Sequence, residues 1–232
     1  MPEEPKLCRR RIAQDGACLF NSIRYLCSAM TETPDSLREH CATIILSSPE
    51  IYNATYLDKE PAAYAEWIRD PVQYGGEIEI LILAEKFKTK ISVVDCQVGS
   101  RAQLLTYGPD EATTRIYMAY SGRHYDALVT TQRRDGEVDD ETCTRRFSED
   151  QCTGEGGVDT LAKLFADNER DREQIDLLTR IRKKIKCGGC GALLADNEAF
   201  QTHCTEVEHD DDFAYDCEEV EVRETVANVD DD

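Results

Sequence analysis

Cys18 and the short loop before it have the composition of a nucleophile site. The loop Asp15-Gly16-Ala17 contains a glycine, and Cys18 begins a segment with helical apolar spacing. A helix N-terminus lowers the pKa of a thiol through its free N–H groups and its dipole, so Cys18 is a candidate nucleophile. Backbone N–H groups of the loop and of Cys18 can converge on an oxyanion, and Asp15 can hold the loop by accepting N–H bonds, as an N-cap does.

His124 is the candidate general base for that thiol. It follows a glycine turn at the start of a predicted strand, which suits a ring that projects into a cleft, whereas His40 lies within a predicted helix. Asp126 lies two residues later on the same strand face, where its carboxylate can accept from the imidazole and fix the tautomer. Nucleophile, base and orienting acid are the parts of a cysteine hydrolase. The alternative, on spacing alone, makes Cys18 a small core residue and His124 a surface turn residue.

A second group of reactive side chains lies near the C-terminal end. Four residues follow the C-x2-C-x12-H-x5-H spacing of zinc ligands: Cys187, Cys190, His203 and His209. Gly188-Gly189 allows a tight turn between the cysteines, and a predicted helix over 197–202 presents His203. A segment this short buries too little apolar area to fold without a metal ion. We therefore predict a structural zinc ion, with Cys204 or Cys217 as an alternative fourth ligand and an unmetallated loop as the other possibility.

Helical patterns occupy the first part of the chain, and strand patterns the part that follows. The clearest predicted helices, from apolar periodicity, are 18–30, 36–47 and 77–87. The predicted strands, from short β-branched runs, are 90–95, 102–107, 115–120 and 125–130. Helices followed by a cluster of strands indicate an α+β fold, with a central, mostly antiparallel sheet flanked by helices.

Composition divides the chain into five parts. Residues 132–157 are polar, charged and glycine-bearing, and the residues that follow regain helical character. The predicted parts are a catalytic domain over 1–132, a linker over 133–157, a helical connector over 158–186, a C2H2 zinc finger over 187–209 and an acidic tail over 210–232. We expect the tail to be solvated, and a basic run over 180–186 to face it.

Negative charge is concentrated at the C-terminal end. The net charge is −20, and residues 187–232 hold 15 acidic residues against one basic residue, a net of −14. Such a segment repels nucleic-acid phosphates, and the predicted finger helix has no Lys or Arg, so binding of nucleic acid is disfavoured and contact with protein is favoured.

Two features of the sequence bear on the cellular compartment of the protein: the membrane and secretory segments that it lacks, and the number of its cysteines. No apolar run is long enough to span a membrane, and the N-terminus does not resemble a secretory signal. The 11 cysteines are an odd number and suit free thiols, metal ligands or a nucleophile in a reducing compartment. We expect a cytoplasmic protein, with nuclear access as an alternative and no membrane contact.

Three segments resemble those of the ovarian tumour (OTU) family of cysteine proteases. Asp15 to Phe20 is similar to the family's D-x-x-C-L-F, Tyr74 to Glu79 to its W-G-G-x-x-E, and Gly122 to Asp126 to its G-x-H-Y-D. They occur in the family's order, and together they are specific. The subgroup most similar to this chain has an OTU domain followed by a C-terminal C2H2 finger.

The resemblance implies a deubiquitinating enzyme. Such an enzyme hydrolyses the isopeptide bond between the C-terminal glycine of ubiquitin and a lysine amine, through a thioester acyl-enzyme. Cys18 would be the nucleophile and His124 the base. Asp15 matches the acid before the cysteine and Asp126 the acid that orients the histidine, and the relative importance of the two stays open. Expected partners are ubiquitin, polyubiquitin chains and ubiquitinated proteins. The alternative function is a catalytically weak ubiquitin-binding adaptor with a zinc finger.

The chain departs from the family pattern in three places. Tyr74 stands where Trp is usual, which keeps an aromatic wall of different size. Arg123 stands where an apolar residue is common, beside His124 and facing a ubiquitin tail that is itself basic. The few residues before the catalytic segment leave no room for the N-terminal ubiquitin-like module of larger relatives. Direct docking on the valosin-containing unfoldase, which that module mediates, is therefore doubtful.

Overall fold

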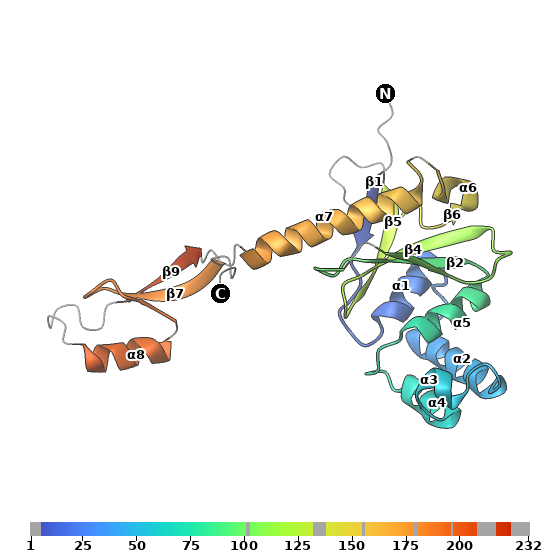
Figure 1. Ribbon diagram of the computed structural model, residues 1–232, viewed down its shortest axis with the longest axis horizontal. Helices are drawn as coiled ribbons and strands as arrows, with labels where there is room; N and C mark the ends of the chain where they lie inside the picture. The colour runs from blue at the N-terminus through green and yellow to red at the C-terminus, as the bar shows by residue number, and fades with distance from the viewer. Residues whose placement is uncertain are drawn as a thin grey trace, which may run out of the picture. The chain divides into compact units, whose positions relative to one another are not determined.

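The computed structural model of the protein describes residues 6–100, 103–131, 138–154, 156–178, 181–195, 197–207 and 217–223. The chain divides into two compact units, residues 1–170 and 171–232, and each is described by itself (Figure 1). Within the described residues, no helix combines the length and the apolar character that crossing a membrane requires.

The first unit is built on one mixed sheet. Its strands are β1 (Lys6–Arg10), β2 (Lys90–Asp95), β3 (Leu104–Tyr107), β4 (Thr114–Tyr120), β5 (Tyr125–Thr131) and β6 (Phe147–Ser148). They lie in the order β1-β5-β4-β2-β3, with β6 on β4. The β2–β4 pair is parallel and the other described pairs are antiparallel. This confirms the predicted α+β fold with a mostly antiparallel sheet.

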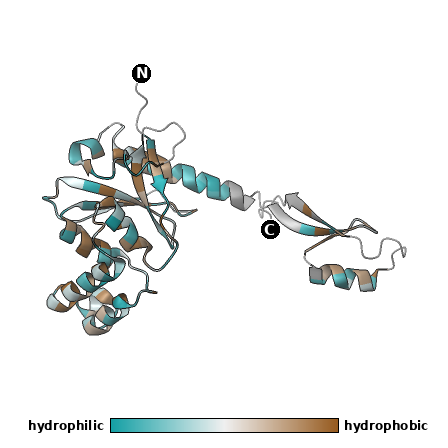
Figure 2. Cartoon of the chain, turned by 180° about the vertical axis from the view of Figure 1, so that it is seen from behind, coloured by the Kyte–Doolittle hydropathy of each residue, from teal (hydrophilic) through white to brown (hydrophobic). Residues whose placement is uncertain are grey.

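Helices cover both faces of this sheet (Figure 1). They are α1 (Cys18–Leu26), α2 (Pro34–Ser47), α3 (Ala54–Leu57), α4 (Pro61–Arg69), α5 (Glu77–Phe87), α6 (Glu149–Cys152) and α7 (Val158–Leu178). Side chains alternate along β4, so Ile116 and Met118 pack with the core of α1 to α5, and Tyr117 and Ala119 pack with Val158 and its neighbours from α7. The α7 ribbon is mostly hydrophilic, because only a narrow stripe of it faces the sheet (Figure 2).

Helix α1 fixes the position of Cys18 through the burial of its apolar face. Leu19, Phe20, Ile23 and Leu26 are each at most 1% exposed. The helix ends at Leu26, earlier than predicted, and Ser28 soon after it takes the left-handed conformation, with φ of 54°. The buried face therefore holds the first turn of α1 firmly against the sheet.

Part of the segment predicted as a linker belongs to the first unit. Phe147–Ser148 pairs with β4, and Phe147 and Cys152 lie in the buried cluster beside α7. Arg115 of β4 donates to Glu149 at 2.6 Å. The linker predicted over 133–157 is thus corrected for 147–152. Polar composition hid two apolar residues whose burial depends on strands distant in the sequence.

The second unit contains a small antiparallel sheet and one helix. Strands β7 (Ile181–Cys187), β8 (Leu193–Leu194) and β9 (Cys217–Arg223) lie in the order β8-β7-β9, and the helix is α8 (Asn197–Glu206). Two predictions were wrong here: the connector 158–186 is helical only to Leu178, and part of the tail forms β9. The register sets Lys186 opposite Glu218, so the basic run does face part of the acidic tail.

Candidate active site

Cys18 lies at the start of α1 against the first residue of β5. It is only 2% exposed, and the backbone N–H groups of Tyr125 and Leu19 approach its thiol. One turn later, Ser22 Oγ donates to the Tyr125 carbonyl at 3.1 Å. The helix is therefore tied to the residue that follows His124, as the predicted pairing of nucleophile and base requires.

The Cys18 thiol is not acidified in this structure, contrary to the prediction from its helix position. Burial raises the pKa of Cys18, the two backbone N–H groups lower it, and the nearby carboxylates of Asp15 and Asp126 raise it further. This raised pKa favours the protonated form of the thiol. Attack on a carbonyl then requires a base that removes its proton during the reaction.

The His124 imidazole is oriented by Asp126. His124 Nε2 lies 3.1 Å from Asp126 Oδ1, and the N–H of Ile12 donates to the same oxygen at 2.7 Å. A carboxylate only accepts, so Nε2 carries the hydrogen and Nδ1 is the nitrogen left to take a proton. In the described residues no hydrogen bond joins Cys18 Sγ to this ring. Catalytic hydrogen bonds of hydrolases often form only once the substrate is bound.

Asp15 organises the loop before Cys18 rather than the imidazole. Asp15 Oδ1 accepts from the Ala17 N–H at 2.9 Å, and its carbonyl accepts from the Cys18 N–H at a longer 3.3 Å. The Ala17 N–H is thus already used and cannot serve an oxyanion. The Gly16 N–H has no partner among the described residues and is free to donate, and the Cys18 N–H can join it only by leaving its long bond to the Asp15 carbonyl.

Gly16 of the nucleophile loop and Gly75 of the second predicted segment each pack closely against another part of the chain. A Cβ on Gly16 would lie 2.4 Å from the Pro71 carbonyl oxygen, and one on Gly75 would lie 2.7 Å from Leu19 Cδ2. The glycines therefore serve close backbone approach as well as turning. Tyr74 of the second segment is 61% exposed.

The buried side chain of Glu79, the last residue of the second segment, bonds back to Gly76 of the same segment. It is 1% exposed and accepts from the Gly76 N–H at 2.7 Å and from the Tyr64 hydroxyl at 2.9 Å. Burial raises the pKa of Glu79, while these donors lower it. Arg38 of α2 is also buried in this region, and the sequence did not predict it. The pattern of α2 does not distinguish a buried arginine from a solvated one.

A pocket of about 250 Å³ opens beside the start of β5. Tyr120 and Tyr125 stack in its wall with ring centroids 4.6 Å apart, and Glu77 and Asp95 also line it. Arg123 is exposed and does not line this pocket. The pocket therefore combines aromatic faces with two carboxylates, which suits a basic side chain or a peptide segment that carries one.

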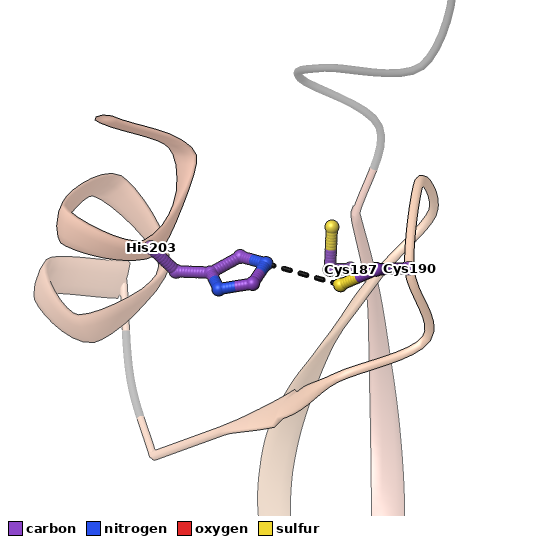
Figure 3. Close-up of side chains that lie close together, drawn as sticks. All are labelled: Cys187, Cys190 and His203. Carbon is purple, nitrogen blue, oxygen red and sulfur yellow. Dashed lines mark hydrogen bonds between the residues drawn. The ribbon is translucent and has the colours of Figure 1, made fainter. Parts of the chain in front are cut away.

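The second unit brings three of the four predicted metal ligands together. The ligand atoms of Cys187, Cys190 and His203 all lie within 4.8 Å of one another, and Cys190 Sγ lies 3.2 Å from His203 Nε2 (Figure 3). Backbone N–H groups lower the pKa of Cys187, which favours the thiolate that a metal binds. His209 lies outside the described residues. Cys204 and Cys217 are described and do not join the group.

Comparison with known proteins agrees with this geometry. Residues 13–128 match the OTU-like cysteine protease family, a range that includes all four candidate catalytic residues. The chain is 33% identical over 79% of its length to the ovarian tumor domain-containing deubiquitinating enzyme 2 of Arabidopsis thaliana, covering 86% of that protein. It is 30% identical over 87% of its length to the ubiquitin thioesterase OTU1 of Dictyostelium discoideum, but spans only 59% of it.

A solved structure shows the same fold. The structure of an ovarian tumor domain in complex with ubiquitin superimposes with a TM-score of 0.61 and 26% identity, covering 72% of this chain and 88% of that one. The family match over residues 13–128 contains Cys18, His124, Asp15 and Asp126. This chain belongs to the OTU-like cysteine protease family.

Proposed function

We propose that this protein is a deubiquitinating cysteine protease, which hydrolyses isopeptide bonds of ubiquitin chains or conjugates. The observation that carries the proposal is the His124–Asp126 pair beside the buried Cys18 thiol. The substrate class is supported by relatives named as ubiquitin thioesterases and by the solved domain bound to ubiquitin.

The chemistry follows from the donor and acceptor roles in the site. His124 Nδ1 takes the Cys18 proton as sulfur attacks the carbonyl carbon of the C-terminal glycine. The Gly16 and Cys18 N–H groups stabilise the oxyanion that forms. The imidazolium, held by Asp126, then protonates the departing lysine amine and leaves a thioester. Water, activated by His124, hydrolyses the thioester and restores the thiol.

The pocket beside β5 fits the tail of such a substrate. Ubiquitin's C-terminal tail is basic, and Glu77 and Asp95 supply negative charge in a pocket that Tyr125, the residue after His124, also lines. Tyr120 and Tyr125 supply flat apolar walls. We assign this pocket to the tail.

We also propose that the second unit holds a structural zinc ion. Cys187, Cys190 and His203 fit tetrahedral coordination in identity and proximity, and His209 is the proposed fourth ligand. The metal would supply folding free energy to a small unit and no chemistry at Cys18. The surrounding negative charge favours a role in protein contact over nucleic-acid binding. Eleven free cysteines are in keeping with a cytoplasmic or nuclear setting.

A second candidate function is a ubiquitin-binding adaptor with weak or no turnover. The neutral thiol and the missing Cys18–His124 hydrogen bond favour it. The intact catalytic set argues against it, because each group needed for hydrolysis is present within one site.

Diubiquitins of every linkage separate the two functions. The wild type, Cys18→Ala and Cys143→Ser are incubated with each one, and Cys143 is the control because it is a partly exposed thiol outside the site. We expect cleavage of at least one linkage by the wild type and by Cys143→Ser, and none by Cys18→Ala. Binding without cleavage of any linkage would contradict the protease and favour the adaptor.

A further inference from the structure

Arg38 of α2 is a buried cation that ends on backbone carbonyls of three separate segments. It is 1% exposed, and its guanidinium lies 4.4 Å from the centroid of the Phe20 ring. Its acceptors are the carbonyl oxygens of Ile68 at 2.9 Å from Nη1, and of Gly16 at 2.7 Å, Gln73 at 2.7 Å and Pro71 at 3.3 Å from Nη2. No carboxylate among the described residues forms an ion pair with it.

A buried guanidinium that no carboxylate contacts directly is costly for the fold, even though Asp35, Glu79 and Asp70 lie near enough to act on its charge. Desolvation lowers the pKa of Arg38, and its Nε has no hydrogen-bond partner in the described residues. An apolar side chain of similar volume would fill the same space without this cost. What the guanidinium adds is a fixed link between the end of α4, the segment before Tyr74 and the loop before Cys18.

The link reaches the nucleophile loop through a single peptide unit. Arg38 Nη2 holds the Gly16 carbonyl, and Asp15 Oδ1 holds the Ala17 N–H at the other side of the same planar group. A peptide plane whose oxygen and N–H are both held by hydrogen bonds resists rotation. This restrains ψ of Gly16 and φ of Ala17, the two torsions that flank the plane, and so limits how the neighbouring peptides that carry the Gly16 and Cys18 N–H groups can turn.

We propose that Arg38 is a positioning residue for the reaction at Cys18, an inference that rests on the proposed hydrolase function. With Asp15, it holds the Gly16–Ala17 peptide so that the loop keeps the free Gly16 N–H, and the weakly bonded Cys18 N–H, in place for the developing oxyanion. It touches neither the substrate nor the reacting sulfur. Its contribution is made in the transition state, where charge appears on the carbonyl oxygen, and therefore falls on kcat more than on KM.

Arg115 provides a matched control for the loss of a buried arginine. It is 8% exposed and binds Glu149 and Asp159, which anchor α6 and α7. Arg38→Lys and Arg115→Lys both keep the charge and remove the planar fork. A difference between the two variants then reports on the loop rather than on general stability.

Three measurements on the full chain test the proposal. The first is kcat and KM with ubiquitin that carries a C-terminal fluorogenic amide. The second is amide hydrogen exchange over residues 14–18. The third is the alkylation rate of Cys18 by iodoacetamide, a displacement that forms no oxyanion and so controls for access to the thiol.

For Arg38→Lys we expect kcat to fall by about 10- to 100-fold, with KM and alkylation within about threefold of the wild type. Exchange over 14–18 should become faster. Arg115→Lys should leave both kcat and this exchange close to the wild type. A kcat for Arg38→Lys that is unchanged, or that falls no further than that of Arg115→Lys, would overturn the proposal, as would unchanged exchange in the loop.

Two other results also bear on the proposal: a variant that does not fold, and a wild type without turnover. If Arg38→Lys does not fold, Arg38→Gln, which still donates two hydrogen bonds, is measured in its place. If neither folds, Arg38 holds the domain as a whole and the specific role is wrong. A wild type with no turnover would sink the proposed function. The exchange arm then still decides whether Arg38 fixes the loop.

Discussion

At the scale of single residues, the two aspartates of the site have different partners. Asp126 contacts the His124 ring, and Asp15 contacts the Ala17 backbone. The alternation of a strand was enough to predict the first contact, and the loop composition was enough to predict the second. Two features of the site were not predictable: the hydrogen bond that occupies the Ala17 N–H, and the raised pKa of Cys18. Both depend on the three-dimensional surroundings, which residue spacing does not contain.

Asn substitutions should separate these aspartates. Asp126→Asn places an amide against His124 Nε2 and disturbs the tautomer, so kcat should fall on the order of 10²- to 10⁴-fold. In Asp15→Asn the side-chain oxygen still accepts from the Ala17 N–H, so the loss should be about tenfold or less. Steady-state hydrolysis of a ubiquitin fluorogenic amide gives both values. A greater fall in kcat for Asp15→Asn than for Asp126→Asn would show that Asp15 is the more important acid.

The raised pKa of Cys18 predicts a pH dependence. An elevated thiol pKa keeps sulfur protonated through neutral pH, and the thiolate appears only above the usual range. The iodoacetamide alkylation rate of the Cys18 peptide, followed by mass spectrometry, should therefore keep rising to at least about pH 9. A plateau reached by neutral pH would show that a thiolate–imidazolium pair already exists in the resting enzyme.

At the scale of elements, local patterns predicted what local interactions determine. Helix α1 and strands β4 and β5 carry strong periodicity, and they occur close to where the sequence placed them. Strands β6 and β9 were not predicted, because β6 has only two residues, β9 is rich in acidic residues, and each forms only against a strand distant in the chain. Strand β7 was mistaken for helix, because a run of lysines and isoleucines suits either state until its partner is known.

Gly75 and Gly76 provide a test of how the second segment packs on α1. A Cβ on Gly75 would overlap Leu19 and crowd Phe20, whereas one on Gly76 meets nothing within 4 Å. Gly75→Ala should lower the free energy of unfolding by about 1–3 kcal/mol, because the buried side chains of Leu19 and Phe20 must move, and kcat should fall because Cys18 is the residue before Leu19. Gly76→Ala should cost less than about 1 kcal/mol. Urea denaturation measures both, and equal costs would contradict the close approach of Gly75.

At the scale of the whole molecule, the two units divide the chemistry. All candidate catalytic residues lie in residues 1–170, and the metal-ligand group lies in residues 171–232. The ligand spacing predicted this group from sequence alone. The strands around it escaped prediction, because this segment has few apolar residues to mark its elements.

Metal content tests this division. The wild type should bind one zinc ion per chain by elemental analysis, and Cys190→Ser should lose it, since a ligand is removed. Cys204→Ser should keep the metal, because Cys204 lies outside the group. Hydrolysis of the fluorogenic amide should stay within about twofold in both variants. Retention of zinc by Cys190→Ser, or loss of turnover with the metal, would contradict the assignment.

The most direct test of the account uses ubiquitin with a C-terminal electrophile as a covalent probe. The probe demands both recognition of the tail and attack by the proposed sulfur, so it tests substrate class and nucleophile together. The wild type and Cys143→Ser should form one adduct, mapped by mass spectrometry to Cys18, and Cys18→Ala should form none. A wild type that forms no adduct, or a Cys18→Ala variant that still forms one, would contradict the central claim.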